Sequence, residues 1–316
     1  MPDRIPTTRL APSPTGALHL GNARTFVVNW IMARQRGWRI VMRMEDLDGP
    51  RVKTWAVNAC YDILTWLGLD WDEGPLTQSA DMQPYREAMH RLAATGAAYP
   101  CELTRREIEE ARSAPHPGEA SRENWYDPAL RPPLHARDFD DAGDANWRYV
   151  TPDRDVAFED AFAGPQSWNP GRTTGDFVVW TRHGQPAYQL AVVIDDHRQG
   201  VTQVVRGDDL LDSAARQMLL YEALELGSGP TWRHLPLVVG EDGRRLAKRH
   251  GDTRLATYRE AGVRAERVLG LLACWCGMMA SPDEISLAEF VEGFNDDKMP
   301  RDPIVFDAEA DAWLRE

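Results

Sequence analysis

The chain has 316 residues, of which 43% are hydrophobic and 27% charged, a balance typical of a globular protein with a substantial core. It contains no run of about 20 apolar residues and begins without the profile of a signal peptide, so we expect a cytoplasmic protein with no membrane partner. The net charge of −13 argues against a nucleic-acid partner unless positive charge is concentrated locally.

The first elements alternate between strand and helix. In chain order, the patterns predict a strand at 7–11, a tight loop at 12–16, a helix at 20–36, a strand at 39–44, and helices at 54–67 and 84–95. Strand, helix and strand at this spacing form a parallel α/β unit, which binds ligands at the carboxyl ends of its strands.

The second half of the chain begins with a change of composition. Residues 113–146 are rich in Pro, Gly, Asp and Arg and predict an irregular surface insertion. Beyond it, the patterns predict strands at 147–150, 177–180, 190–194 and 201–205, a helix at 213–226, a strand at 234–239, and helices from about 264 onward, including an amphipathic one at 286–294.

The segment TRLAPSPTGALHLGN, residues 8–22, places His19 and Gly21 at the start of the helix that follows the first strand. The N-terminus of a helix binds phosphate because its N–H groups lack partners and carry partial positive charge. Gly21 lets a nucleotide approach the backbone closely, and His19 supplies a donor for charge that develops on a phosphate. His-x-Gly alone is a weak signal, but with the ten preceding residues it predicts an ATP site.

A second segment, RRLAKRHG at residues 244–251, follows the last predicted strand. Six basic residues fall within eleven positions: Arg244, Arg245, Lys248, Arg249, His250 and Arg254. Such a run by itself is usually a solvated surface turn. Paired with the His19 segment it predicts the other half of the ATP site, with Lys248 reaching the pyrophosphate leaving group.

The two segments resemble the HIGH motif and the KMSKS loop of class I aminoacyl-tRNA synthetases of the glutamyl/glutaminyl branch. Further matches follow in family order: RMEDLD at 43–48, WLGLDWDEGP at 66–75, YQLAVVIDD at 188–196 and VRGDDLL at 205–211. The matches run from residue 7 to 250. They imply an α/β fold with a class I synthetase Rossmann-like parallel sheet at 1–100 and 190–250, an inserted α+β subdomain at 101–189, and a short C-terminal helical region at 251–316.

Within that branch, the chain is most similar to the family of glutamyl-queuosine tRNA(Asp) synthetases. The sequence continues for about 65 residues after the Lys248 loop, which leaves no room for an anticodon-binding domain, and Val192 stands where glutamyl-tRNA synthetases typically carry asparagine. The resemblance implies activation of L-glutamate by ATP with Mg²⁺, without tRNA. The glutamate is then attached to the cyclopentene diol of queuosine at the wobble position of tRNA(Asp). We expect a monomer.

The resemblance also implies roles for individual residues. His19 and Lys248 are the expected catalytic residues. The expected ATP-binding residues are Pro12, Gly16, His19, Gly21, Asn22, Arg245, Leu246 and Lys248. The expected glutamate-binding residues are Arg9, Ala11, Ser13, Glu45, Tyr188 and Arg206. A selective pocket needs fixed cations for the side-chain carboxylate, matched by Arg9 and Arg206, and an anion for the ammonium group, matched by Glu45.

The signature segments depart from the family pattern at a few positions. Asn22 replaces the second histidine of the HIGH motif, a change seen within this branch. In the loop, Arg245 replaces the first lysine and Ala247 the serine, while Lys248 remains. Positive charge is kept at both ends of the loop, so we expect ATP activation to survive.

A zinc site that is common in the family is not expected. Its Cys-x-Cys and downstream Tyr-x3-Cys map onto Cys101, Leu103, Tyr126 and Leu130. Cys101 and Tyr126 remain, but two leucines cannot ligate zinc, and a tetrahedral structural site needs four ligands. We therefore predict that no metal is bound there.

Three other functions are compatible with parts of this pattern. A truncated glutamyl-tRNA synthetase would charge the 3′ end of tRNA(Glu), and an adenylyltransferase for another acceptor would share the phosphate motifs. A non-catalytic paralogue would bind tRNA or another protein. The joint presence of His19, Lys248, Arg9 and Glu45 argues against the paralogue, because binding alone does not require all four.

Overall fold

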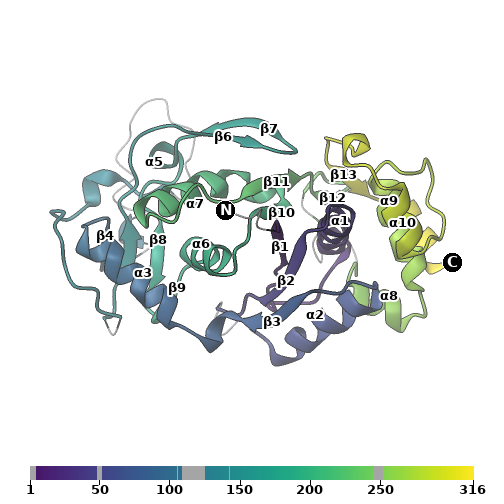
Figure 1. The fold of residues 1–316 in the computed structure, drawn as a ribbon, viewed down its shortest axis with the longest axis horizontal. Coiled ribbons are helices and arrows are strands. Elements are labelled where there is room, and N and C mark those ends of the chain that lie inside the picture. Colours follow the sequence, from purple (N-terminus) through teal and green to yellow (C-terminus); the bar gives the residue numbers. More distant parts are fainter. Residues whose placement is uncertain are drawn as a thin grey trace.

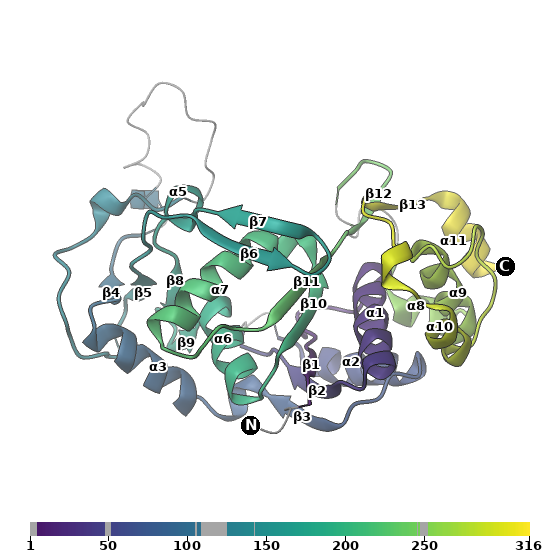
Figure 2. The same cartoon turned by 45° about the horizontal axis from the view of Figure 1, so that its top comes forward.

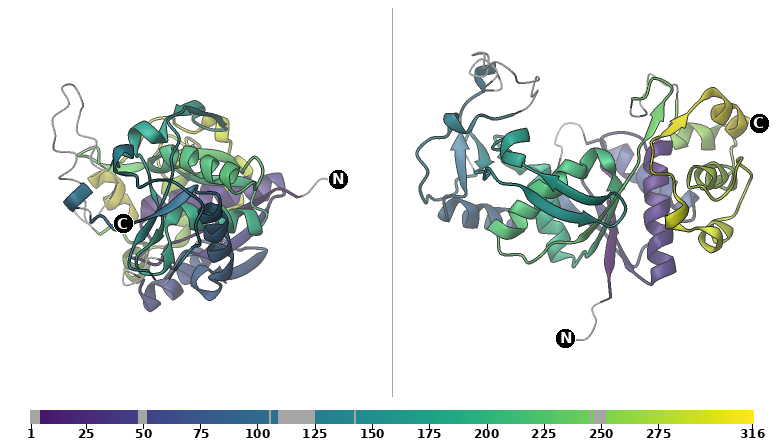
Figure 3. Two further views of the ribbon diagram at one scale, coloured as in Figure 1. Left: turned by 90° about the vertical axis from the view of Figure 1, so that its left-hand side faces the viewer. Right: turned by 90° about the horizontal axis from the view of Figure 1, so that it is seen from above.

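The computed structural model describes residues 5–47, 52–104, 106–108, 125–141, 143–244, 246 and 252–316. The molecule is elongated, with parallel strands at its centre, an antiparallel sheet at one end, and the C-terminal helices at the other end (Figures 1 and 3). In the described part of the chain, no helix combines the length and the apolar character that a membrane span requires.

Two parallel sheets lie side by side at the centre of the molecule. The first is β1 (Thr7–Leu10), β2 (Arg39–Met44) and β3 (Glu73–Thr77), in that order, and the second is β10 (Gln203–Gly207) with β11 (Thr231–Leu235). The sheets meet where β1 lies beside β10 (Figures 1 and 2), and there the Thr202 N–H donates to the Thr7 carbonyl oxygen at 2.8 Å. Open parallel sheets bind ligands at such a junction, beyond the carboxyl ends of the strands.

Helix α1 (Leu20–Arg36) connects β1 to β2, and α2 (Thr54–Trp66) connects β2 to β3. All four residues of β1 are buried, as expected for a parallel strand covered on both faces. Asn29 of α1 fixes the helix to this strand: its Nδ2 donates to the Arg9 carbonyl oxygen at 2.9 Å, and its Oδ1 accepts from the Thr8 hydroxyl at 2.8 Å. The start of α1 is thereby held close to the end of β1.

The inserted region contains an antiparallel sheet and a hairpin. Its elements are α3 (Gln83–Ala94), β4 (Ala98–Cys101), β5 (Asn146–Tyr149), β6 (Val156–Asp160), β7 (Gly164–Trp168), α5 (Pro170–Thr173), β8 (Val178–Thr181) and β9 (Gln185–Pro186). The sheet has the order β4-β5-β8-β9, and β6 pairs with β7. α3, this sheet, α6 (Tyr188–Arg198) and α7 (Leu211–Ala223) share one apolar core. The division of the chain at residues 101, 190 and 251 stays a prediction.

The C-terminal region packs against α1. Its elements are β12 (Val238–Gly240), α8 (Leu255–Glu260), α9 (Ala265–Trp275), α10 (Leu287–Gly293), β13 (Ile304–Phe306) and α11 (Ala308–Arg315). β13 pairs in parallel with β12, and the apolar residues of α9 and α10 join the core formed by α1 and β2. The helix that begins at the predicted ATP site is therefore supported along its length by residues near the end of the chain.

Two predicted strands are wrong. Residues 190–194 form the middle of α6, and every residue from Gln189 to Asp196 is buried. A short apolar run that is buried on all sides has the same pattern in a strand and in a helix, so periodicity cannot distinguish them. The predicted strand at 234–239 is divided into β11 and β12, because Pro236 lies between them and has no N–H to donate to a strand ladder. The other predicted elements are present, with bounds shifted by at most three residues.

Candidate active site

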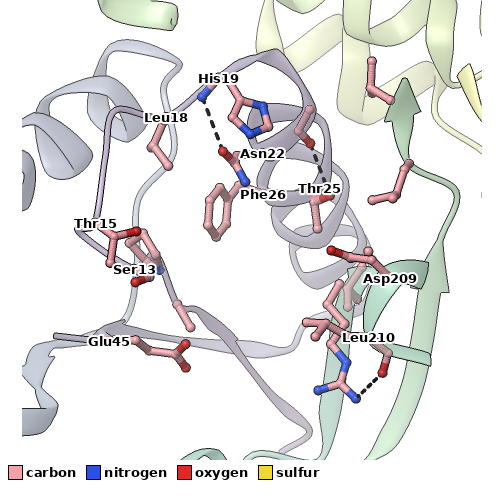
Figure 4. Close-up of a pocket in the computed structure, with 18 of the residues that line it drawn as sticks. Ser13, Thr15, Leu18, His19, Asn22, Thr25, Phe26, Glu45, Asp209 and Leu210 are labelled. Carbon is pink, nitrogen blue, oxygen red and sulfur yellow. Dashed lines mark hydrogen bonds between the residues drawn. The ribbon is translucent and has the colours of Figure 1, made fainter. Parts of the chain in front are cut away.

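A cavity of about 900 Å³ opens at the carboxyl ends of β1 and β10, beside the start of α1 (Figure 4). The predicted site residues that line it are Arg9, Ala11, Pro12, Ser13, Gly16, His19, Gly21, Asn22, Glu45, Tyr188 and Arg206. His19 and Asn22 lie at one end of this space, and Glu45 and Leu210 lie at the other (Figure 4). The structure therefore brings the predicted nucleotide and amino-acid groups into one cavity.

The end of the cavity that is predicted to bind the nucleotide is the N-terminus of α1. His19 precedes the helix in an extended conformation, and its N–H donates to Asn22 Oδ1 at 3.4 Å. The first turn of α1 carries no acidic residue, so its partial positive charge is not offset there. Asn22 thus caps the backbone at the position where the family motif has its second histidine.

Gly21 has a second function that the sequence did not reveal. A Cβ atom at Gly21 would lie 3.2 Å from the ring of His19 and 3.5 Å from the Cβ of Val238. The missing side chain therefore leaves room for the imidazole as well as for a nucleotide. An alanine at this position would press on the ring of His19.

The two signature segments meet through their flanking residues. Arg245 and Lys248 lie outside the described residues. On one side of the loop, the Leu246 N–H donates to the carbonyl oxygen of Val238, which lines the cavity, while the Leu246 side chain packs into the core. On the other side, residues 253–255 run antiparallel to residues 18–20, and His19 pairs with Arg254. Both ends of the loop are thus anchored next to the start of α1.

Next to the end of the cavity that is predicted to bind the amino acid lies a buried acidic network that is organised by Arg43. Its Nη1 donates to Asp196 Oδ1 at 2.7 Å, and its Nη2 donates to Glu45 Oε1 at 2.9 Å. Although burial disfavours the charged form, the carboxylates of Asp196, Glu45 and Asp195 raise the pKa of Arg43. Arg43 therefore fixes the Glu45 carboxylate, which points into the cavity (Figure 4).

Arg9 connects this network to the neighbouring strand. Its Nε lies 3.5 Å from Asp196 Oδ1, and its Nη1 donates to the Val205 carbonyl oxygen at 3.3 Å. The side chain is 6% exposed and shares the Asp196 carboxylate with Arg43. Part of its charge is thus already balanced within the protein.

Arg206 is a buried cation with neutral partners. Its Nε donates to His234 Nε2 at 2.9 Å, its Nη1 donates to Gln217 Oε1 at 3.0 Å, and its Nη2 donates to the Leu210 carbonyl oxygen at 3.2 Å. Burial lowers the pKa of Arg206, although arginine stays protonated. No carboxylate among the described residues forms an ion pair with it. A carboxylate that entered the cavity would supply the missing negative charge.

Sequence reasoning assigned no role to Arg43, Asp196, His234 or Asp209. Arg43, Asp196 and Asp209 fall in matched segments. Arg43 lies within the apolar strand RIVMRM, and Asp196 closely follows the apolar run of residues 190–194. A charged residue in such a position is a signal for a buried ion pair. His234 had no such signal. The unpredicted residues that line the cavity are Thr15, Ala17, Leu18, Thr25, Phe26, Val205, Gly207, Asp209, Leu210, Pro236, Leu237 and Val238.

Burial raises the pKa of Glu45 above its usual value, against the opposing effects of Arg43 and Arg9. An ammonium group binds the ionised carboxylate, so affinity is complete above this raised pKa and is lost as the pH falls through it. We expect KM for glutamate to rise by up to about tenfold per pH unit as the pH falls through this raised pKa. Pyrophosphate exchange from pH 5 to 8 measures this, and Glu45→Gln, with a high and nearly constant KM, is the control. A wild-type KM that rises only at or below the pH at which a free glutamate side chain titrates would contradict the role given to Glu45.

The residues that match the zinc ligands of the family form a packed cluster. Cys101 Sγ lies 3.6 Å from the Tyr126 hydroxyl, which donates to the Leu130 carbonyl oxygen at 3.2 Å. Leu103 and Leu130 pack against these two residues. Among the described residues, no three His, Cys, Asp or Glu side chains are grouped closely enough to hold a metal ion.

Comparison with known proteins gives consistent similarities. A family model described as tRNA synthetases class I (E and Q), catalytic domain, matches residues 6–308. Glutamyl-Q tRNA(Asp) synthetases from Symbiobacterium thermophilum and Rhodopirellula baltica are each 44% identical, over 97% and 87% of this chain and 97% and 86% of their own lengths. A crystal structure of a glutamate tRNA ligase from Elizabethkingia meningosepticum in complex with its amino acid superposes on this chain with a TM-score of 0.79 at 26% sequence identity. The match covers 98% of this chain and 69% of the ligase chain.

Proposed function

Since the chain belongs to the class I tRNA synthetases for glutamate and glutamine and, within them, to the glutamyl-Q tRNA(Asp) synthetase family, we propose that it activates L-glutamate with ATP and transfers the glutamyl group to queuosine in tRNA(Asp). The observation that carries the proposal is the composition of one cavity. It combines a helix N-terminus for phosphate, the fixed carboxylate of Glu45, and Arg206, whose described partners are all neutral.

In the first step, the α-carboxylate of glutamate attacks the α-phosphorus of ATP. A bond forms between a carboxylate oxygen and the α-phosphorus. The bond from the α-phosphorus to the oxygen that bridges the α- and β-phosphates breaks, and pyrophosphate leaves. The carboxylate is already ionised at neutral pH, so no general base is needed. Catalysis then consists of positioning and charge stabilisation. His19 and the start of α1 are proposed to stabilise the α-phosphate, and Lys248 the departing pyrophosphate.

Glutamate is proposed to bind with its ammonium group on Glu45 and its side-chain carboxylate on Arg206, with Arg9 and Tyr188 beside it. Ala11 and Ser13 would contact it from the end of β1. Tyr188 begins α6 and lines the cavity, where its side chain lies near Arg206. In the second step, a hydroxyl of the cyclopentene diol attacks the carbonyl carbon of the adenylate, loses its proton, and displaces AMP.

Magnesium is proposed to enter as the ATP complex. It retains several waters when it is bound through phosphates, so it requires at most one or two protein carboxylates. Asp209 lines the cavity and fits that requirement. We also propose that the protein acts as a monomer in the cytoplasm.

The acceptor is tested with ATP, radiolabelled glutamate and three purified tRNAs: tRNA(Asp) with queuosine, tRNA(Asp) without it, and tRNA(Glu). Label is expected on queuosine-containing tRNA(Asp) alone. Labelling of tRNA(Glu) would favour a truncated glutamyl-tRNA synthetase. Glutamate-dependent pyrophosphate exchange without any tRNA is expected as well, and its absence would favour a non-catalytic paralogue. Exchange without labelling of any of the three tRNAs would favour an adenylyltransferase for another acceptor.

We predict that the protein contains no structural zinc. Leu103 and Leu130 occupy the cluster around Cys101 and Tyr126 and supply apolar contacts where the family has ligands. Inductively coupled plasma measurement on protein purified without chelator should find far less than one zinc per chain. After treatment with a chelator, removal of the chelator and addition of Mg²⁺, activity and thermal unfolding should be unchanged. One zinc per chain, lost together with stability, would show that the prediction is wrong.

A further inference from the structure

A buried chain of hydrogen bonds extends from Arg206, away from the cavity, to the turn of the β6–β7 hairpin. Arg206 Nε donates to His234 Nε2 at 2.9 Å, and His234 Nδ1 lies 2.6 Å from Asp160 Oδ2. His234 and Asp160 are each 1% exposed, and Arg206 is 5% exposed. Neither His234 nor Asp160 is among the residues that line the cavity.

The donor and acceptor of each hydrogen bond from Arg206 to His234 and from His234 to Asp160 follow from the chemistry of the groups. A guanidinium has N–H donors and no acceptor, so His234 Nε2 must be an unprotonated acceptor. The ring proton therefore resides on Nδ1 and is donated to Asp160. Burial lowers the pKa of His234, although Asp160 opposes this effect, so the ring is neutral. The imidazole is thus held in one tautomer and one orientation.

Asp160 is itself held in place by the backbone. Its Oδ1 accepts from the N–H groups of Ala163 at 2.7 Å, Phe162 at 3.0 Å and His234 at 3.2 Å. The Ala161 N–H donates to the Trp232 carbonyl oxygen of β11 at 2.8 Å. The hairpin runs alongside α7, with its turn next to β11 (Figure 2). Asp160 therefore cannot turn away from His234 without breaking the hairpin turn.

The other side of Arg206 is also fixed by a neutral group. Gln217 Nε2 donates to Gln189 Oε1 at 2.9 Å, so the Gln217 carbonyl oxygen faces Arg206. A guanidinium has five N–H donors. Three are used by His234, Gln217 and the Leu210 carbonyl oxygen, which leaves one N–H on each Nη atom. Arg206 and Tyr188 both line the cavity, and the Tyr188 side chain also interacts with the guanidinium. Two parallel N–H donors match a carboxylate and do not match an amide.

We propose that His234, held by Asp160, is a positioning residue that orients Arg206 without neutralising it and so determines the preference for glutamate over glutamine. A carboxylate in direct contact with Arg206 would compete with the carboxylate of the substrate. The imidazole of His234 instead orients Arg206 with a neutral acceptor. It also separates the negative charge of Asp160 from the guanidinium by the width of one ring. The inference rests on the proposed function, because it concerns the amino acid that this cavity selects.

A pair of variants at residue 234 separates orientation from packing. In His234→Gln, the longer amide oxygen reaches the place of Nε2 and can accept from Arg206. In His234→Asn, the shorter amide can contact Asp160 but leaves Arg206 Nε without its acceptor. We expect His234→Asn to raise KM for glutamate by about tenfold or more, with kcat and KM for ATP nearly unchanged. The ratio of kcat/KM for glutamate over glutamine should fall by a similar factor. His234→Gln should restore both values to within about threefold of wild type.

Asp160→Asn provides a second test, because Asp160 is the last partner in the series of hydrogen bonds that begins at Arg206. Its amide N–H would face Nδ1, which moves the ring proton to Nε2 and opposes the Arg206 N–H. The same rise in KM for glutamate is expected, with thermal unfolding recorded for each variant. Equal KM values in His234→Asn and His234→Gln, or an equal loss for ATP, would overturn the inference while leaving the proposed function intact. A wild-type protein that neither binds nor activates glutamate would overturn both.

Discussion

Replacing Arg206 by leucine is expected to lower kcat/KM for glutamate by about a thousandfold, because removing one partner of a buried charge pair costs roughly 2–5 kcal/mol. The side-chain carboxylate of glutamate would then enter a buried space without its cation. Arg9 cannot replace it, since its Nε lies beside Asp196 and its Nη1 is bound to the Val205 carbonyl oxygen. Pyrophosphate exchange without tRNA measures the effect, which should appear mainly in KM.

The matched control is Arg233→Leu, on the adjacent strand β11. Arg233 contacts the ring of Trp38 and donates to Gln203 Oε1, and it is not among the residues that line the cavity. The Arg233→Leu substitution should lower the temperature of thermal unfolding but leave KM for glutamate nearly unchanged. Similar activity losses in the two variants would assign the Arg206 effect to general destabilisation and would contradict its role in binding.

Replacing His19 by alanine is expected to lower kcat for adenylate formation by about a hundredfold, which is typical for the loss of one donor to a developing negative charge. The affinity for glutamate should be nearly unchanged, because Glu45 and Leu210 lie at the other end of the cavity (Figure 4), and Arg206 donates to the Leu210 carbonyl oxygen there. Pre-steady-state measurement of adenylate formation separates the two quantities. His183→Ala, at an exposed turn between β8 and β9, is the control.

Lys248→Ala extends this test to the loop, although Lys248 lies outside the described residues. Adenylate formation should fall more than tenfold while glutamate binding is spared, because a lysine that meets the leaving pyrophosphate acts after glutamate has bound. Lys298→Ala, at an exposed position in the C-terminal region, is the control. Unchanged pyrophosphate exchange in Lys248→Ala would show that the loop has no part in the first step.

Some features of the fold follow directly from the sequence. The strand at residues 7–10, the helix at 20–36 and the strand at 39–44 were predictable because each has a local period and a clear boundary. The resemblance to the synthetase branch then placed Arg9, Glu45, Tyr188 and Arg206 in one site. The cavity contains all four. Residues 190–194 were mistaken for a strand, because a segment that is buried on every side has no polar face to reveal its period.

The sequence alone predicts the phosphate-binding turn and the types of charge in the amino-acid pocket, because both predictions depend on residues that are close in the chain or belong to ordered motifs. Tertiary structure alone decided how those charges are balanced. Arg43 reaches Asp196 across 153 positions, and His234 reaches Asp160 across 74. Hydrogen bonds over such separations leave no periodic trace in the sequence, since they arise only when distant strands and a hairpin pack together. They are nevertheless what leaves Arg206, among the described residues, without a carboxylate partner of its own.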